Sequence, residues 1–220
     1  MSVAVVTGAN RGIGLELCRQ LRSQGHEVVA TCRAHSDALE ALGLRVISGV
    51  DVTDSDSIRT LMDALAPKSV DILINNAGRL ESSPLGSIDY AAIQRQWEVN
   101  ALGPLRVTEA LLPKLAPRAK VALVSSRMGS IADNSSGGSY GYRMSKAALN
   151  AAGKSLAHDL APLGIAVVIL HPGYVRTEMT EGRGSVEPRE SADLLLQRID
   201  ELTIKSTGRF VHANGEELPW

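Results

Sequence analysis

Tyr142 and Lys146 stand four residues apart in a stretch whose alanines and leucines predict a helix. Residues four apart lie on the same face of a helix, so the lysine ammonium would stand beside the tyrosine phenol. A tyrosine titrates near pH ~10, and poising it near neutrality takes a shift of about three units, or roughly 4 kcal/mol in favour of the phenolate. A phenol tuned in this way could exchange a proton with a substrate oxygen. The alternative is that a tyrosine and a lysine share a helix face by chance, which is common.

A glycine-rich segment near the start of the chain is the second candidate for chemistry. It runs Thr7-Gly8-Ala9-Asn10-Arg11-Gly12-Ile13-Gly14, between an apolar strand-like segment and a predicted amphipathic helix. Glycines in this position let backbone amides approach a pyrophosphate, and the helix N-terminus adds its positive end. The spacing differs from G-x-G-x-x-G, so a strand-to-helix turn that merely needs glycine is the alternative.

The elements that must position these residues alternate between strand and helix. Short segments rich in Val, Ile and Leu are typical of parallel strands, and stretches with helical spacing lie between them, several ending in Gly or Pro, as at Gly25 and Pro67. This order predicts an α/β fold: a single doubly wound Rossmann-type domain, residues 1–220, whose parallel sheet of about seven strands is flanked by helices on both faces. Ligands bind outside the carboxyl ends of such strands. The strand segments identified are Val3–Thr7, Glu27–Cys32, Leu44–Ile47, Val70–Ile74, Val121–Ser125 and Ile165–His171.

Composition narrows the possible partners. The 220 residues are 44% hydrophobic and 21% charged, with a net charge of −1 and interspersed signs, so no basic stripe is available for a nucleic-acid backbone. No apolar stretch approaches membrane-spanning length and no signal-peptide pattern is visible, so we expect a cytoplasmic protein that binds neither nucleic acid nor membrane. Cys18 and Cys32 are expected to be reduced packing residues, and the scattered histidines predict no metal site. His171 is expected to be packed or solvated and not to act as a base.

Further motifs follow the predicted strands in order along nearly the whole chain. Asp51-Val52 follows the third strand, Asn75-Asn76-Ala77-Gly78 the fourth and Pro172-Gly173-Tyr174-Val175-Arg176-Thr177 the sixth, while Asn100 and Tyr142-Arg143-Met144-Ser145-Lys146 lie on predicted helices. With the Thr-Gly-x-x-x-Gly-Ile-Gly turn, this set resembles the motifs of the short-chain dehydrogenase/reductase family. The C-terminal sequence from Thr207 to Trp220 also resembles the branch that contains C-factor-like proteins and some carbonyl reductases.

The resemblance implies a catalytic set and a nicotinamide dinucleotide site. Tyr142 would move the proton, Lys146 would also hold the nicotinamide ribose, and Asn100 would hold a water in a relay toward Lys146. On sequence alone, Asn100 is equally well explained as a helix-kink residue before Gly103-Pro104. With Ser126, these are the candidate catalytic residues. The dinucleotide would be bound by Gly8, Asn10, Arg11, Gly12, Ile13, Gly14, Arg33, Asp51, Val52, Asn76, Ala77, Gly78, Tyr142, Lys146, Pro172, Gly173, Val175 and Thr177.

Two serines end the fifth predicted strand, and either could hydrogen-bond a substrate oxygen. The resemblance favours Ser126 over Ser125, because the family's catalytic serine is usually the second of such a pair. Ser126 lies sixteen positions before Tyr142, a longer spacing than is usual in the family, and a longer loop through Asp133–Gly141 would absorb the difference. Ser139 and Ser145 are nearer, but loop and cap duties explain them.

The end of the second strand indicates which nicotinamide dinucleotide is bound. An NAD site needs an acid there for the ribose hydroxyls, whereas a 2′-phosphate needs cationic forks and no nearby carboxylate. Cys32 occupies the expected acidic position, and Arg11 and Arg33 could converge on one phosphate. We therefore predict NADP(H) in preference to NAD(H). The alternative is that both arginines are ordinary solvated loop residues.

The function implied by this resemblance is reduction of an aldehyde or ketone to an alcohol, or the reverse, on a small-molecule substrate. Substrate specificity is expected to come from the loop Arg127–Gly141 and the segment Arg176–Pro188. A cofactor-binding signalling or regulatory protein of C-factor type, with little or no turnover, is the alternative. Relatives usually associate through two long helices, here about Ile88–Leu112 and Tyr142–Leu160, so we expect a homodimer or homotetramer.

Overall fold

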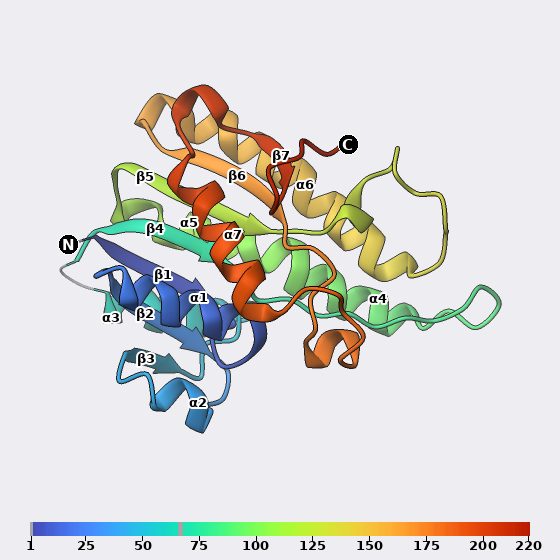
Figure 1. Cartoon of the computed structure of the whole chain (residues 1–220), viewed down its shortest axis with the longest axis horizontal. Coiled ribbons are helices and arrows are strands. Elements are labelled where there is room, and N and C mark those ends of the chain that lie inside the picture. Colours follow the sequence, from blue (N-terminus) through green and yellow to red (C-terminus); the bar gives the residue numbers. More distant parts are fainter. Residues whose placement is uncertain (1, 66–67) are drawn as a thin grey trace.

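A parallel sheet forms the centre of the computed structural model, which describes residues 2–65 and 68–220. Within those residues, seven strands lie in the order β3-β2-β1-β4-β5-β6-β7 (Figure 1). Every neighbouring pair in the sheet is parallel. The strands are β1 Val3–Thr7, β2 Glu27–Cys32, β3 Arg45–Ser48, β4 Val70–Asn75, β5 Leu115–Val124, β6 Ala166–His171 and β7 Arg209–His212.

Two layers of helices cover the faces of the sheet (Figure 1). One layer contains α1, Gly12–Ser23, and α7, Pro188–Asp200, which pack against each other. The other contains α3, Ser55–Ala64, α5, Gly103–Leu111, and α6, Tyr140–Leu160. The short α2, Asp37–Glu40, joins β2 to β3, and α4, Tyr90–Trp97, packs against α6. No helix among the described residues is both long and apolar enough to cross a lipid bilayer.

Alternation along the strands explains why both faces need a cover. In β1, Val6 belongs to the core that contains Leu17 of α1, whereas Val5 belongs to the core that contains Leu61 of α3. Successive strand residues point to opposite faces, so a sheet that is apolar at every position must be buried on both sides. Val3–Thr7 is buried throughout, as this requires.

The order of the strands fixes where a ligand can bind. The chain runs outward from β1 through β2 to β3 and then returns to β4 on the other side of β1. The turns that follow β1 and β4 therefore leave the sheet in opposite directions and open a crevice at their carboxyl ends.

The predicted fold class is correct, while several element boundaries differ from the sequence-based expectation. β5 begins at Leu115, well before the predicted Val121. The prediction missed its first half because that part contains Pro117 and the left-handed Arg118 (φ 69°) and lacks an apolar run. β7, Arg209–His212, was absent from the predicted segments because only Phe210 and Val211 of its four residues are apolar. The helix that carries Lys146 begins at Tyr140, inside the predicted loop Asp133–Gly141. Pro67, the expected end of a helix, lies outside the described residues.

Phe210 offers a test of the core, because this phenylalanine on β7 is 1% exposed. We expect Phe210→Ala to lower the free energy of unfolding by about 3–5 kcal/mol, since it removes a large buried side chain and leaves a cavity. Thermal unfolding followed by circular dichroism would measure the loss. Leu85→Ala is the control: Leu85 is 77% exposed, so its change should stay within about 0.5 kcal/mol. Equal losses in the two variants would contradict the placement of Phe210.

Candidate active site

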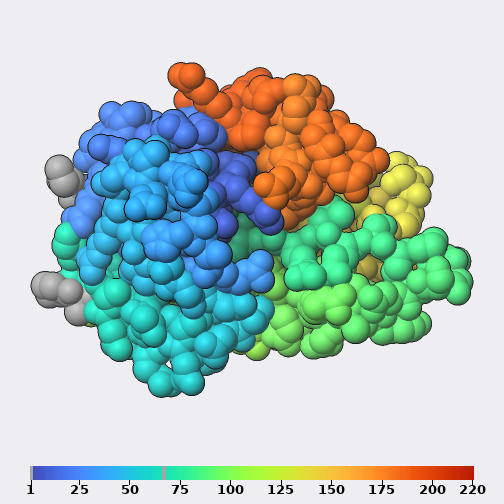
Figure 2. Space-filling model, turned by 90° about the horizontal axis from the view of Figure 1, so that it is seen from below, coloured from blue at the N-terminus to red at the C-terminus, as the bar shows by residue number. Residues whose placement is uncertain are grey.

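A cavity of about 920 Å³ lies at the carboxyl ends of the strands. It opens between the blue N-terminal part of the chain, the green part and the orange segment that follows β6 (Figure 2). The structure brings most of the predicted site residues to its wall; Asn100, Ser126, Gly173 and Val175 lie outside the lining. The predicted residues that line it are Gly8, Asn10, Arg11, Gly12, Ile13, Gly14, Arg33, Asp51, Val52, Asn76, Ala77, Gly78, Tyr142, Lys146, Pro172 and Thr177.

The glycine-rich turn packs too closely for side chains. A Cβ on Gly14 would lie 2.3 Å from the Gly8 carbonyl oxygen, and Gly8 itself has a φ of 64°. At the start of α1, Arg11 gives no side-chain cap and the first turn contains no acidic residue. The amide groups and positive end of this helix are therefore available to an anion in the cavity. These features fit the pyrophosphate of a dinucleotide.

Asn76 joins the turn after β4 to the turn after β1. Its Nδ2 donates to the carbonyl oxygens of Thr7 (3.0 Å) and Gly8 (3.1 Å), and its backbone N–H donates to Thr7 Oγ1 (3.0 Å). Ala77 N–H donates to the same hydroxyl at 3.1 Å. Hydrogen bonds across this switch point hold the two walls of the crevice at a fixed separation.

The two arginines predicted to converge on a phosphate have different partners. Arg11 forms an ion pair with Glu178, in the turn that follows β6. Arg33 lies near Asp51, whose pKa falls below its usual value: burial raises it, but hydrogen bonds from Thr53 and the charge of Arg33 outweigh that effect. Both arginines line the cavity, and their convergence on one phosphate stays a prediction, with Arg11 paired to Glu178 in this structure.

Tyr142 and Lys146 lie together on α6, both buried, and both reach the cavity. Lys146 Nζ donates to the Val124 carbonyl oxygen at 2.8 Å and lies 5.8 Å from the centre of the Tyr142 ring. Burial lowers the pKa of Lys146 to about 7. Burial also raises the pKa of Tyr142 to about 12, although hydrogen bonding with Ser126 opposes the shift. The expected lowering of the tyrosine pKa toward neutrality is wrong for this structure, because desolvation of the phenolate outweighs its stabilisation by neighbours.

The two candidate serines have different duties. Ser125 is buried, and its Oγ donates to Asn150 Oδ1 at 2.5 Å, so its hydrogen is engaged inside the fold. Ser126 Oγ accepts a hydrogen bond from Met128 N–H at 3.1 Å. That bond uses only an acceptor lone pair of Ser126, so its hydroxyl hydrogen can face Tyr142, with which the same side chain interacts. The geometry favours Ser126 as the predicted substrate-binding serine, even though Ser125 is the one that lines the cavity.

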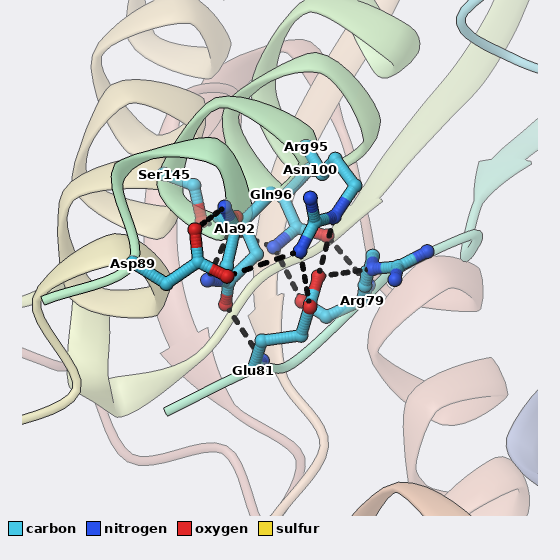
Figure 3. Close-up of polar contacts among 8 residues, drawn as sticks. All are labelled: Arg79, Glu81, Asp89, Ala92, Arg95, Gln96, Asn100 and Ser145. Atoms are coloured by element: carbon cyan, nitrogen blue, oxygen red, sulfur yellow. Dashed lines mark hydrogen bonds and ion pairs between the residues drawn. The ribbon is translucent and has the colours of Figure 1, made fainter. Parts of the chain in front are cut away.

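Asn100 sits in a π-helical turn, Glu98–Leu102, between α4 and α5. Its Oδ1 accepts from Arg79 N–H and its Nδ2 donates to Arg79 O, both at 2.7 Å; Nδ2 also donates to Ser145 Oγ at 3.0 Å (Figure 3). The distortion predicted as a kink is a single π turn, in which Gly103 N–H bonds to Glu98 O. Asn100 thus holds the segment that follows the Asn-Asn-Ala-Gly motif.

Gln96, which the sequence analysis missed, holds the same segment one turn earlier. It is 1% exposed, its Oε1 accepts from Glu81 N–H at 3.0 Å, and its Nε2 donates to Ala92 O at 3.2 Å (Figure 3). Two buried amide side chains therefore fix residues 79–81, which line the cavity. A glutamine in a helix gives no sequence signal for such a role.

Glu81 forms a charged cluster with Arg79 and Arg95 at this side of the cavity. Its carboxylate is bound by Arg95 Nη2 at 2.9 Å and by Arg79 Nε (Figure 3). Hydrogen bonds from Arg95 and then Arg79 lower the pKa of Glu81 to about 2, so the group stays ionised at neutral pH. Lining residues outside the predicted catalytic and dinucleotide-binding set include Cys32 and Leu80, and also Arg176, Glu178 and Met179 of the segment expected to set substrate specificity. Most are immediate neighbours of a predicted motif, which is the signal that could have found them.

His171 is packed, which was one of the two expected alternatives. Its ring meets that of His212 edge to face, with centroids 4.8 Å apart. Burial, followed by the charges of His212 and Arg127, lowers its pKa to about 3. A neutral histidine in this position belongs to the packing of β6 against β7.

Comparison with known sequences gives a family for the whole arrangement. The family model described as short chain dehydrogenase matches residues 2–187. The chain is 44% identical over 226 residues to the 1-hydroxy-2-glutathionyl-2-methyl-3-butene dehydrogenase of Rhodococcus sp. (strain AD45), with both proteins covered in full. It is also 49% identical over 154 residues to the C-signal protein of Myxococcus xanthus, which covers 69% of this chain and 93% of that protein.

Comparison with solved structures gives the same result. The NADPH-bound carbonyl reductase from chicken fatty liver superposes with a TM-score of 0.90 at 29% identity, covering the whole of both chains. The family model, the two relatives and this fold agree on one family. This chain is an oxidoreductase that belongs to the short-chain dehydrogenase/reductase family.

Proposed function

We propose that this protein reduces an aldehyde or ketone to an alcohol, or catalyses the reverse reaction, with NADP(H) as coenzyme. The observation that carries the proposal is the buried Tyr142, which reaches the same cavity as the glycine turn and has Lys146 and Ser126 beside it. The chicken carbonyl reductase binds NADPH in a similar fold, which supports the choice of coenzyme and reaction.

The residues of this chain have separable roles in the proposed reaction. The nicotinamide, when bound, supplies or accepts the hydride. The pKa of Tyr142 is about 12, so at neutral pH the phenol is protonated and its Oη is a proton donor for the oxygen of a carbonyl. Ser126, beside Tyr142, would donate its hydroxyl hydrogen to that oxygen and so orient it. Lys146, when charged, favours the phenolate that forms as the proton leaves.

Selection of NADP(H) over NAD(H) depends on the end of β2. Cys32 and Arg33 line the cavity where an acid would bind the ribose hydroxyls of NAD. Burial raises the pKa of Cys32, so this thiol stays neutral and does not repel a phosphate. Arg33 supplies a cation at the same place.

Charged residues in the cavity lining suggest a substrate with polar or charged substituents. Arg79, Glu81 and Arg176 line the cavity together with Leu80 and Met179. The Rhodococcus relative is named for an alcohol that carries a glutathionyl group. We therefore include glutathionyl alcohols among the substrates to be tested. The similarity to the C-signal protein supports a second candidate, a dinucleotide-binding regulator with little or no turnover.

Association into a homodimer or homotetramer is part of the proposal. The helices α4, α5 and α6 leave several large apolar side chains exposed, among them Tyr90, Trp97, Leu105 and Met144. Sedimentation at micromolar concentration should return a multiple of 23.3 kDa. A protein that sediments as the monomer would contradict this part of the proposal.

Replacement of the tyrosine is the first test of the reaction. We expect the wild-type protein to oxidise NADPH faster than NADH with a panel of aldehydes, ketones, diketones and quinones, and to oxidise glutathionyl alcohols with NADP⁺. Tyr142→Phe should lower kcat by about 10²- to 10⁴-fold, because the proton donor is lost. Dinucleotide binding by Tyr142→Phe, measured by fluorescence, is the control for folding. Wild-type turnover in this variant would refute the mechanism, and binding without turnover in the wild type would favour the regulatory candidate.

The two serines give a matched pair of variants. Ser126→Ala should lower kcat by about 10²-fold, because it removes a hydrogen bond to the developing negative charge on the substrate oxygen. Ser125→Ala should act mainly on stability, by about 1–3 kcal/mol, because it leaves buried Asn150 Oδ1 without its donor. The two effects are separated by measuring kcat and thermal unfolding for both proteins. A larger loss of kcat in Ser125→Ala would reverse the assignment.

Burial of the Lys146 ammonium should lower the free energy of unfolding, although the residue serves the proposed reaction. Its pKa is about 7 in the folded protein and 10.5 when exposed, so between these values the unfolded chain binds a proton that the folded chain lacks. Stability therefore rises with pH across this window, and the penalty is largest below pH 7. We expect Lys146→Met to raise the free energy of unfolding by roughly 2–4 kcal/mol below that pH, and we expect this increase to disappear above pH 10.5. Thermal unfolding at several pH values would measure this, with Lys154→Met, an exposed change on the same helix, as control. A gain that does not depend on pH would contradict the explanation.

A further inference from the structure

Glu178 is the acidic partner of Arg11 across the cavity. Arg11 lies in the glycine turn after β1 and Glu178 in the turn after β6, and both line the cavity. The two turns are close together, since a Cβ on Gly12 would lie 3.2 Å from Thr177 Cγ2. The ion pair thus connects two walls of the proposed dinucleotide site.

The position of Glu178 is fixed by the turn that carries it. Thr180 Oγ1 donates to the Val175 carbonyl oxygen at 2.7 Å and accepts from Thr177 N–H at 3.1 Å. Thr180 N–H donates to Thr177 O, and Gly182 N–H donates to the same oxygen at 2.9 Å. Because this backbone is held on both sides, the Glu178 carboxylate stays within reach of Arg11.

The pair is solvent-exposed, so it can be exchanged for a stronger partner. The side chains of Arg11 and Glu178 are 64% and 72% exposed. Ion pairs with this exposure contribute little and are screened by salt. A phosphate monoester carries nearly two negative charges at neutral pH and offers several acceptor oxygens to a guanidinium.

We propose that Glu178 competes with the coenzyme's 2′-phosphate for Arg11 and thereby weakens NADP(H) binding without affecting NAD(H). The inference rests on the proposed function, because it requires a dinucleotide in this cavity. Arg33, which also lines the cavity, is available to hold the phosphate, while Arg11 must leave Glu178 before it can join. Glu178 is then a specificity-determining residue that favours release of the phosphorylated coenzyme.

The experiment measures dissociation constants of NADPH and NADH by isothermal titration calorimetry, so turnover is not needed. We expect Glu178→Gln to lower the Kd for NADPH by about two- to fivefold and to leave the Kd for NADH unchanged. The difference should shrink as ionic strength rises. Glu181→Gln is the matched control: it removes the same charge from the same turn, but Glu181 pairs with Arg183 and lies outside the cavity lining.

A double mutant shows whether Arg11 transmits the effect. In an Arg11→Met background, Glu178→Gln should no longer change the Kd for NADPH. The inference is overturned if Glu178→Gln leaves NADPH affinity unchanged or weakens it, if it strengthens both coenzymes equally, or if Glu181→Gln has the same effect. Failure of the wild type to bind either dinucleotide would instead overturn the proposed function, and this inference with it.

Discussion

The hydrogen bonds of Asn76 are the constraint on which the rest of the site depends. A parallel sheet whose strand order reverses at β1 and β4 opens a crevice there, but the two turns leave in opposite directions and need a tie. Asn76 supplies it through the backbone oxygens of Thr7 and Gly8. With that separation fixed, the glycine turn, the start of α1 and the wall that leads to residues 79–81 become parts of one cavity.

Burial then sets the chemistry inside that cavity. Tyr142 and Lys146 are packed against the sheet, and desolvation disfavours the charged form of both. The tyrosine is thereby kept as an acid, and the lysine is brought to a point where its charge responds to small changes around it. Other acidic side chains of the wall have basic partners, as Glu81 has in Arg79 and Arg95.

Much of this could be predicted from the sequence, for physical reasons that particular residues illustrate. Strands such as Val3–Thr7 are buried on both faces and are therefore recognisable in the sequence as apolar runs. Turns such as Thr7–Gly14 need glycine wherever backbones approach closely. Contacts between side chains far apart in the sequence leave no comparable pattern. Glu178 is distant from Arg11 in the sequence, and Gln96 looks like any other polar residue of a helix. The pKa of Tyr142 was also beyond reach, since spacing reveals a neighbouring charge but not the depth of burial.

The π turn at Glu98–Leu102 restricts where insertions and deletions can be accepted during the evolution of this protein. Each residue of a helix advances the chain by about 100°, so one residue more or less there would rotate α5 against α4. Gln96 and Asn100 would then no longer face the same backbone segment, while Val107 and Leu111 would turn out of the core. Length is therefore free to vary in an exposed connection such as residues 82–88 but is fixed within this helix, where a deletion would act on the cavity and the core at once.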